Sequence, residues 1–246
     1  MRLFLLAAAA VLLLTGAADA YNPLTGEDAR FLGRDGRQMQ GWIDYTSSRE
    51  GPDRYATDAY AELAYGLFEK VNLKVTVPWR GWNAGGISES GLGDVLLEAK
   101  FGCECRRGWD LALKPGFSLP AGDEARSLGA GKGGLWLYGI ASRGSGPWLL
   151  ILNGGYMLNR NTLDERRHLL KLSGAAELRV LPELAAAVSI SGGTDADKNV
   201  DVWPVVSSFG AVWTPYRTLD AYAGVQLGLT DPAPALGLVA GLALRI

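Results

Sequence analysis

The chain has 246 residues, of which 24 are Lys or Arg and 26 are Asp or Glu, so its formal net charge at pH 7 is −2. A chain with so balanced a charge and no run of like charge lacks the basic surface that nucleic acid requires, and we expect no nucleic-acid partner. Glycine is frequent, with 33 residues, and 11 prolines punctuate the sequence. This composition favours many short strands over long helices and predicts an all-β fold.

The first twenty residues have the pattern of a secretory signal peptide. Arg2 supplies a positive charge, an apolar run spans residues 3–14, and Ala18 and Ala20 flank Asp19 in a cleavage site of the A-x-A type. The apolar run is too short to span a membrane comfortably, and no second apolar run occurs after it. We therefore expect residues 1–20 to be removed from an exported chain whose mature form starts at Tyr21.

Residues 21–36 contain several turn formers and no periodic pattern, which predicts an irregular N-terminal tail. Such a tail either lies in the periplasm or folds into a lumen, and the sequence leaves both positions open. No linker or low-complexity segment divides the rest of the chain, so residues 37–246 are expected to form one domain.

Twelve segments of this domain have alternating polar and apolar residues or are rich in β-branched and aromatic residues. They span residues 38–47, 55–65, 71–80, 91–102, 109–119, 132–142, 148–158, 168–180, 184–191, 203–214, 219–229 and 236–246. A strand that crosses the outer membrane needs about 9–11 residues. The segments match that length and predict membrane-spanning strands.

The connections between these segments alternate between short and long. Short connections lie near residues 66–70, 102–108, 143–147, 181–183 and 215–218. Longer polar ones lie between them, at residues 48–54, 81–91, 120–131, 159–167 and 192–202, and only the last, residues 230–234, is short where a long one is expected. Short turns at one end and long loops at the other are typical of outer-membrane barrels with both termini in the periplasm.

The predicted strands have two faces of opposite character. In residues 91–101, the apolar face contains Val95, Leu97 and Phe101. The other face contains Leu92, Asp94, Leu96, Glu98 and Lys100. In a soluble strand the polar face would meet water, whereas in an outer-membrane barrel the apolar face meets lipid and the polar face lines the lumen. The alternating loop lengths favour the barrel.

Aromatic residues gather near both ends of the predicted strands. Two such levels would form the interfacial girdles of a membrane barrel, although aromatic residues also fill soluble cores. We expect Trp79, Trp82 and Trp203 at the loop end and Phe101, Trp109, Trp148, Trp213 and Tyr216 at the turn end.

Three short motifs follow one another along the chain: the strand start GLGD at residues 91–94, a Pro-x-Gly-Asp loop at residues 120–123, and a glycine-rich return at residues 129–132. Together they resemble the outer-membrane transporter family that is named after the meta pathway of phenol degradation. Residues 65–79 also look like the strand-turn-strand element of that family. The resemblance covers residues 60–142 and extends over the remainder only by pattern. It implies an outer-membrane β-barrel that passes small, hydrophobic or aromatic molecules, and it brings no catalytic residues.

Charged side chains on the predicted strands must face the lumen, because a charge that faces lipid near the membrane centre costs about 2–4 kcal/mol. The predicted lumen-lining residues are Lys74, Asp94, Glu98, Lys100, Lys114, Lys171, Glu177 and Arg179. Their mixed signs argue against a strong anion or cation selector. These residues either line a permeation route or pair with one another to fill a polar interior, and the sequence leaves both possibilities open.

The sequence contains little that indicates catalysis. A lipase-type barrel needs a serine two residues after the histidine, but Leu170 holds that place after His168, the single histidine. Phosphate-loop, dinucleotide, zinc and EF-hand patterns do not occur, so we expect no enzyme, cofactor or metal site. Cys103 and Cys105 would form a strained disulfide, and whether they are bridged is left open.

The sequence therefore predicts a transmembrane antiparallel up-and-down β-barrel of about twelve strands in the outer membrane of a Gram-negative cell. We expect outer-membrane lipid, a small-molecule solute and the outer-membrane assembly machinery as partners, although Arg245 and Ile246 replace the terminal aromatic residue that is common in such barrels. The leading function is a channel or transporter for small, hydrophobic or aromatic solutes. A closed barrel that acts through its extracellular loops is the alternative, and an outer-membrane hydrolase is a distant third.

Overall fold

The fold was analysed in a computed structural model that describes residues 26–49, 51, 54–104 and 108–246. The predicted signal peptide lies outside the described residues, as do Cys105 and the side chain of Cys103. The expected tail, residues 21–36, is described from Gly26 onward and contains no strand in that part. Within the described part of the chain, no helix has the length and apolarity needed to cross a membrane.

Thirteen strands and one short helix are assigned in the described residues. The strands are β1 (Arg37–Ser47), β2 (Tyr55–Phe68), β3 (Val71–Ala84), β4 (Ile87–Leu92), β5 (Val95–Glu104), β6 (Asp110–Leu119), β7 (Leu135–Ser145), β8 (Trp148–Leu158), β9 (His168–Leu181), β10 (Leu184–Gly193), β11 (Val205–Tyr216), β12 (Leu219–Gly228) and β13 (Leu236–Arg245). The 3₁₀ helix η2 (Glu124–Arg126) lies in the loop between β6 and β7.

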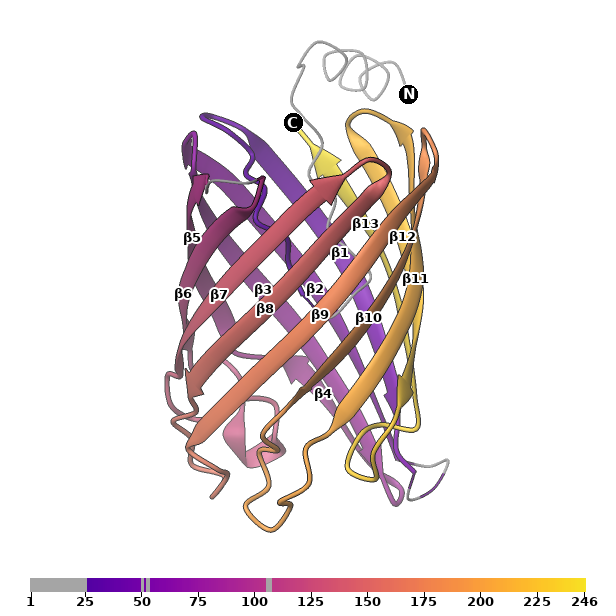
Figure 1. Ribbon diagram of the computed structural model, residues 1–246. Helices are drawn as coiled ribbons and strands as arrows, with labels where there is room; N and C mark the ends of the chain where they lie inside the picture. Colours follow the sequence, from indigo (N-terminus) through magenta and orange to yellow (C-terminus); the bar gives the residue numbers. More distant parts are fainter. Residues whose placement is uncertain (1–25, 50, 52–53, 105–107) are drawn as a thin grey trace, which may run out of the picture.

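The strands form one closed antiparallel barrel (Figure 1). With the exception of β4 and β5, which both pair with β3 and not with each other, each strand pairs with its neighbour in the sequence, and the pairing of β1 with β13 closes the ring. Because β4 and β5 both pair with β3, at successive stretches of it, they count as one interrupted strand of a twelve-stranded barrel. The predicted fold class is therefore confirmed. The C-terminus lies at the end of the barrel that carries the short turns (Figure 1).

The two faces of the wall have the predicted alternation. In β3, Leu73, Val75 and Val77 are exposed on the outside, whereas Lys74 and Thr76 between them are buried. Valine and leucine suit a pleated surface whose neighbours are also apolar. The outside of the barrel is consequently an apolar band, and the inside is polar.

Several exposed aromatic residues lie near the two ends of this band. Trp79 and Trp203 are exposed near the loop end, and Trp148, Trp213 and Tyr216 are exposed near the turn end. This arrangement is that of interfacial girdles. Trp82 differs: its indole Nε1 donates a hydrogen bond to the backbone oxygen of Arg126, 3.0 Å away, and so holds the loop that contains η2.

The expected strand 91–102 is broken, and this corrects the prediction for one residue. Leu92 pairs with Trp79, and Leu96 pairs with Thr76, so four residues of this strand span three of β3. One extra residue in a strand forms a β-bulge. Side chains before the bulge therefore point to the opposite face of the sheet from the one that the uninterrupted alternation predicts. Leu92 is therefore exposed outside the barrel rather than on the face of Glu98 and Lys100.

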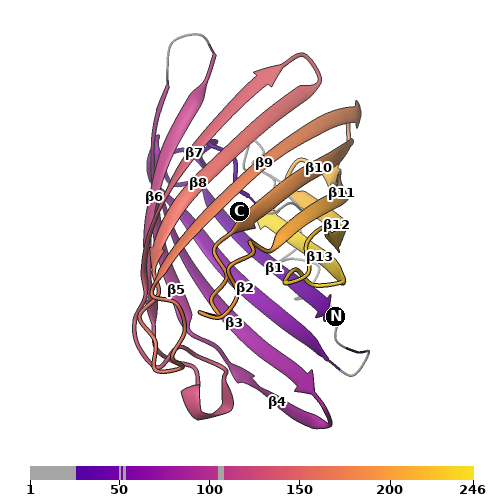
Figure 2. The ribbon, with the colours of Figure 1, turned by 60° about the horizontal axis from the view of Figure 1, so that its bottom comes forward.

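The prediction of a long loop at residues 81–91 is also wrong. Strand β3 continues to Ala84, and β4 returns along it as a hairpin that extends the loop end of the barrel (Figure 2). Gly85 and Gly86 form the turn with φ angles of 60° and 86°. Two consecutive positive φ angles are those of a type I′ hairpin turn, which glycine adopts without steric cost.

Candidate functional site in the barrel lumen

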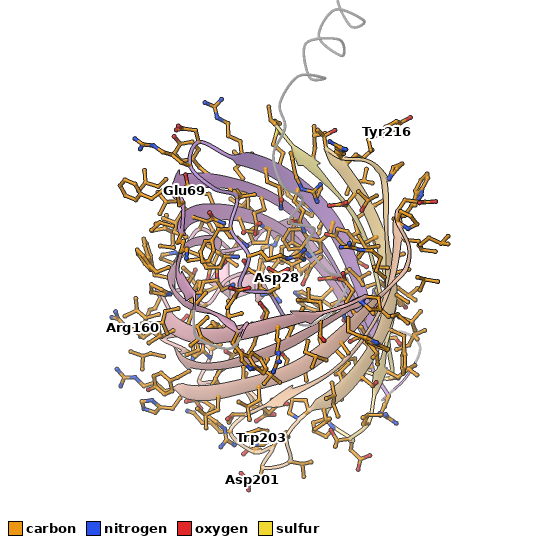
Figure 3. All side chains as sticks on the ribbon, turned by 45° about the horizontal axis from the view of Figure 1, so that its top comes forward. Asp28, Glu69, Arg160, Asp201, Trp203 and Tyr216 are labelled. Atoms are coloured by element: carbon orange, nitrogen blue, oxygen red, sulfur yellow. The ribbon has the colours of Figure 1, made fainter. Side chains whose placement is uncertain are left out.

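The N-terminal segment, residues 26–36, lies inside the barrel and occupies its turn end. At the rim, the backbone N–H of Asp35 donates to the oxygen of Gly66 at 2.8 Å. Deeper in the lumen, Asn153 accepts from the N–H of Glu27 at 3.3 Å and Ser142 accepts from the N–H of Ala29 at 3.2 Å. Viewed from the turn end, Asp28 stands in the middle of the barrel (Figure 3). The segment therefore crosses the bore.

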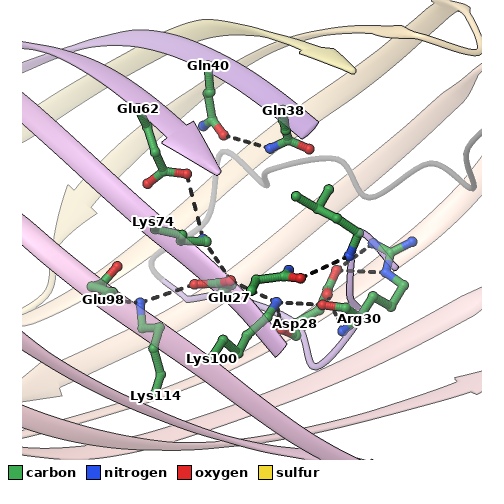
Figure 4. A network of polar contacts seen from close by, with 12 residues as sticks. Glu27, Asp28, Arg30, Gln38, Gln40, Glu62, Lys74, Glu98, Lys100 and Lys114 are labelled. Carbon is green, nitrogen blue, oxygen red and sulfur yellow. Dashed lines mark hydrogen bonds and ion pairs between the residues drawn. The ribbon is translucent and has the colours of Figure 1, made fainter. Parts of the chain in front are cut away.

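The carboxylate of Glu27 is the point at which this segment meets three strands (Figure 4). Its oxygens lie 2.8 Å from Nζ of Lys74 on β3, 2.9 Å from Nζ of Lys100 on β5 and 3.1 Å from Nζ of Lys114 on β6. All four side chains are largely buried. One acidic residue of the N-terminal segment thus ties together three neighbouring parts of the wall.

Two further carboxylates complete what we call the Glu27 cluster. Glu62 lies 3.6 Å from Nζ of Lys74 and accepts a hydrogen bond from Thr76 at 3.0 Å. Glu98 lies 3.0 Å from Nζ of Lys114 and accepts from the indole of Trp136 at 3.0 Å. The cluster, which comprises Glu27, Glu62, Glu98, Lys74, Lys100 and Lys114, is electrically balanced only when Glu27 is present and ionised.

The pKa of Glu27 reflects this balance. Burial by itself raises the pKa of the carboxyl group, but the ammonium groups of Lys100, Lys74 and Lys114 outweigh burial and hold the pKa well below its ordinary value of 4.5. Glu27 is therefore ionised throughout the neutral and mildly acidic range.

Apolar contacts reinforce the ionic ones. The ring of Phe31 lies 5.0 Å beneath Nζ of Lys100, which also donates to the backbone oxygen of Arg30 at 2.5 Å. The Phe31 ring lies directly on the wall at Gly102, where an added Cβ atom would be 2.1 Å from the ring. Glycine at this position is what lets the segment lie against β5.

A cavity of about 580 Å³ lies on the loop side of the Glu27 cluster, and we call it the chamber. Glu27, Glu98 and Lys114 line it, together with residues near the loop ends of their strands, such as Asp44 and Lys171. Its aromatic and apolar lining residues are Trp42, Trp136, Tyr138, Met157, Leu96, Leu172, Val206 and Val239. The chamber is large enough to hold a small organic molecule.

The eight predicted lumen residues separate into three groups. Lys74, Glu98, Lys100 and Lys114 converge on the Glu27 cluster. Lys171 lines the chamber, and Glu177 and Arg179 lie beyond it on the same face of β9 towards the turn end. Asp94 forms the third group by itself, because it binds a loop and lies in neither the Glu27 cluster nor the lining of the chamber.

Asp94 fastens the long loop between β6 and β7. Its Oδ1 atom accepts a hydrogen bond from the N–H of Gly122 at 3.0 Å, and its Oδ2 atom accepts from the N–H of Ala130 at 2.8 Å. The three motifs that carry the family resemblance therefore meet in one place, because the strand start at residues 91–94 binds both ends of the loop.

Glu27 was not among the residues predicted from the sequence, although a signal for it exists. Within the cluster, the strands contribute three lysines and two glutamates, which leaves an excess of one buried positive charge. An uncompensated buried charge is strongly unfavourable. A carboxylate from outside the strands was therefore required, and Glu27 and Asp28 are the acidic residues of the described segment that precedes Gly33.

The environment of His168 is simple. Its Nδ1 atom lies 2.5 Å from Oη of Tyr156, and both side chains are exposed. Among the described residues, no group of three or more His, Cys, Asp or Glu side chains is arranged to hold a metal ion.

A closed antiparallel barrel with an apolar outside, a polar inside and unequal loops defines the class: this is the fold of outer-membrane β-barrel channels. The amino-acid sequence matches no protein-family model and no curated protein. Solved structures do match, and they show the fold alone because the sequence identities are low.

An outer-membrane channel from Pseudomonas putida F1 matches with a TM-score of 0.72 and 13% identity, over 91% of this chain and 100% of that chain. The NanC porin matches with a TM-score of 0.58 and 10% identity, over 85% of this chain and 100% of that one. The KdgM porin, solved in complex with disordered oligogalacturonate, matches with a TM-score of 0.55 and 7% identity, over 85% and 98%.

Proposed function

We propose that the protein is an outer-membrane channel for small solutes, and that its N-terminal segment is a gate held shut by Glu27. The observation that carries the proposal is the contact of one carboxylate of this segment with lysines on three different strands. The strand residues alone leave one positive charge in excess among Lys74, Lys100 and Lys114, so the wall is neutral only while the segment that carries Glu27 is docked.

The likeness to solved channels and porins supports the conducting part of this proposal. The chamber supports the solute part, because an aromatic lining suits small hydrophobic or aromatic molecules. The meeting of the three motifs at Asp94 supports membership of the transporter family named after the meta pathway of phenol degradation. The outer membrane is the location that this proposal implies.

The gate depends on the balance of charges. When the N-terminal segment leaves, Lys74, Lys100 and Lys114 face only Glu62 and Glu98, and the excess positive charge repels itself. Closing restores the balance. A gate of this kind opens without unfolding the barrel, since the wall keeps its hydrogen bonds.

Single-channel conductance of the purified protein in planar bilayers tests the proposal. We expect brief openings in the wild-type protein and an open probability at least about tenfold higher in Glu27→Gln, because removing one partner of a buried ion pair costs about 3–5 kcal/mol. Glu183→Gln, an equivalent change at an exposed position in the β9–β10 turn, should behave like wild type.

Equal open probabilities in wild type and Glu27→Gln would reject the gate. If both proteins are silent although each is folded and heat-modifiable, conduction itself is rejected, and a closed barrel that acts through its loops is favoured. The contact of His168 with the exposed Tyr156 hydroxyl gives a hydrolase no comparable support.

A further inference from the structure

We infer that the chamber binds a small aromatic zwitterion, with Lys171 receiving its anionic group and Asp44 receiving its cationic group. The inference deepens the proposed function and rests on it, because the chamber lies on the route of a solute through the channel. It starts from the charges of the described lumen residues, many of which form ion pairs.

The paired charges include those of the Glu27 cluster, Asp28 with Arg30, and Asp220 with Arg245. Asp58 likewise lies 3.6 Å from Nε of Arg80. Within the described part of the chain, Asp44 and Lys171 line the chamber without an ion-pair partner. Asp44 accepts a hydrogen bond from the Trp42 indole and is paired across the strands with Asp58, which has the same charge and does not neutralise it. Two opposite, uncompensated charges in one cavity are costly unless a ligand or water neutralises them.

The two side chains lie at the same level of the barrel. Asp44 is three residues from the loop end of β1, and Lys171 is three residues from the loop end of β9. Going round the ring, β10, β11, β12 and β13 separate β9 from β1 on one side, and β2, β3, β5, β6, β7 and β8 separate them on the other. The two charges therefore stand on nearly opposite walls of the same chamber.

Aromatic side chains that line the chamber provide a surface for a ring. Trp42 is stacked on Tyr60 with ring centroids 4.6 Å apart and an angle of 11° between the planes. Trp136 is held by its hydrogen bond to Glu98. Rigid, oriented aromatic faces bind a ligand ring with little loss of side-chain freedom.

A ligand with a single charge satisfies only half of this arrangement. An aromatic carboxylate would neutralise Lys171 and leave Asp44 alone, whereas an aromatic amine would do the reverse. A molecule that carries both groups compensates both walls. Charge complementarity therefore selects the zwitterion over either singly charged class.

Isothermal titration calorimetry on the folded, full-length mature protein in detergent tests the inference with three probes: L-phenylalanine, 3-phenylpropionate and 2-phenylethylamine. We expect L-phenylalanine to bind at least about tenfold more tightly than either singly charged probe. Lys171→Gln and Asp44→Asn should each abolish this preference, and Lys171→Glu should shift it towards 2-phenylethylamine. Lys132→Gln, at an exposed loop position, should keep the wild-type pattern.

Equal affinity for the three probes, or an undiminished preference in Lys171→Gln, overturns the inference. Heat-modifiability identifies variants that fail to fold. If Lys171→Gln fails to fold, the Lys171→Glu variant tests the inference instead, because its preference should shift towards 2-phenylethylamine. Because binding is measured without conduction, the two proposals fail separately. A silent barrel that prefers L-phenylalanine rejects the channel, and a conducting barrel without that preference rejects the zwitterion.

Discussion

Among single residues, Glu27 forms ion pairs with three lysines of the lumen, although it lies in a segment without regular secondary structure. An exposed ion pair contributes about 0–1 kcal/mol, since water and salt screen it and two side chains must be ordered. Glu27 is largely buried against Lys74, Lys100 and Lys114, where the loss of one partner leaves a buried charge without compensation. The Glu27 carboxylate therefore adds a strong ionic contribution to the hydrogen bonds and the Phe31 packing that also hold the segment.

The depressed pKa of Glu27 predicts how closure depends on pH. The carboxyl group has its ordinary pKa of 4.5 when the segment is released and a lower pKa when it is docked. Its contribution to docking is thus complete above pH 4.5 and is lost as the pH falls through the docked pKa. We expect the open probability of wild-type channels to rise at a pH below 4.5.

Conductance recorded between about pH 7 and about pH 3 measures this effect. Glu62 and Glu98, which also face the three lysines, are titratable as well, and Glu27→Gln serves as the control for them. The acid-induced increase should be absent or much smaller in that variant. The same increase in both proteins would show that the strand carboxylates, and not Glu27, are responsible.

Among the strands and loops, the break between β4 and β5 links the wall to the longest described loop. The extra residue at this bulge reverses the faces of the strand and lets the Asp94 carboxylate bind the N–H groups of Gly122 and Ala130. Hydrogen bonds to a charged group contribute about 1.5–3 kcal/mol each. Two of them at one residue are enough to order the loop.

We therefore expect Asp94→Ala to release the loop between β6 and β7 without unfolding the barrel. Limited trypsin digestion of the protein in lipid vesicles, followed by mass spectrometry, should show cleavage after Arg126 and Lys132 at least about tenfold faster than in wild type, because about 1.4 kcal/mol corresponds to a factor of ten. Asp195→Ala removes an equivalent turn contact in the β10–β11 loop and should leave these two sites protected. Unchanged cleavage in Asp94→Ala would show that Trp82 and Glu89 hold the loop alone.

The molecule as a whole is defined by an apolar outside that is continuous around twelve strands. Leu152 lies near the middle of β8 and is 53% exposed, whereas Leu135 begins β7 at the loop end and is 51% exposed. Since their exposed fractions are nearly equal, the two positions differ mainly in their depth in the membrane.

This difference allows a matched test of whether the barrel wall spans a membrane. Leu152→Arg should lower the free energy of unfolding by about 2–4 kcal/mol, and Leu135→Arg by about 0–1 kcal/mol, because the cost of a lipid-facing arginine falls towards the interface. Reversible urea unfolding in lipid vesicles measures both values. Equal losses at the two positions would contradict a membrane-spanning wall.

Much of the fold was predictable from the sequence because it depends on local patterns. Alternation with period two distinguishes the faces of each strand, and turn-forming residues mark where strands end. The predicted segment 148–158 coincides with β8, and the alternation places Lys74 inside and Val75 outside. The break at Gly93 was missed, since the bulge is set by pairing with β3 and not by the pattern of one strand.

Residues close together in the chain were enough to specify the barrel, the strand faces and the inward direction of Lys74, Lys100 and Lys114, because each depends on a local alternation of side chains. The place of the N-terminal segment in the lumen, the contact of Glu27 with those lysines, and the chamber shared by Asp44 and Lys171 became visible only in three dimensions. The physical reason is that these contacts join residues far apart in sequence. Their partners are fixed by closure of the barrel, which no local pattern encodes.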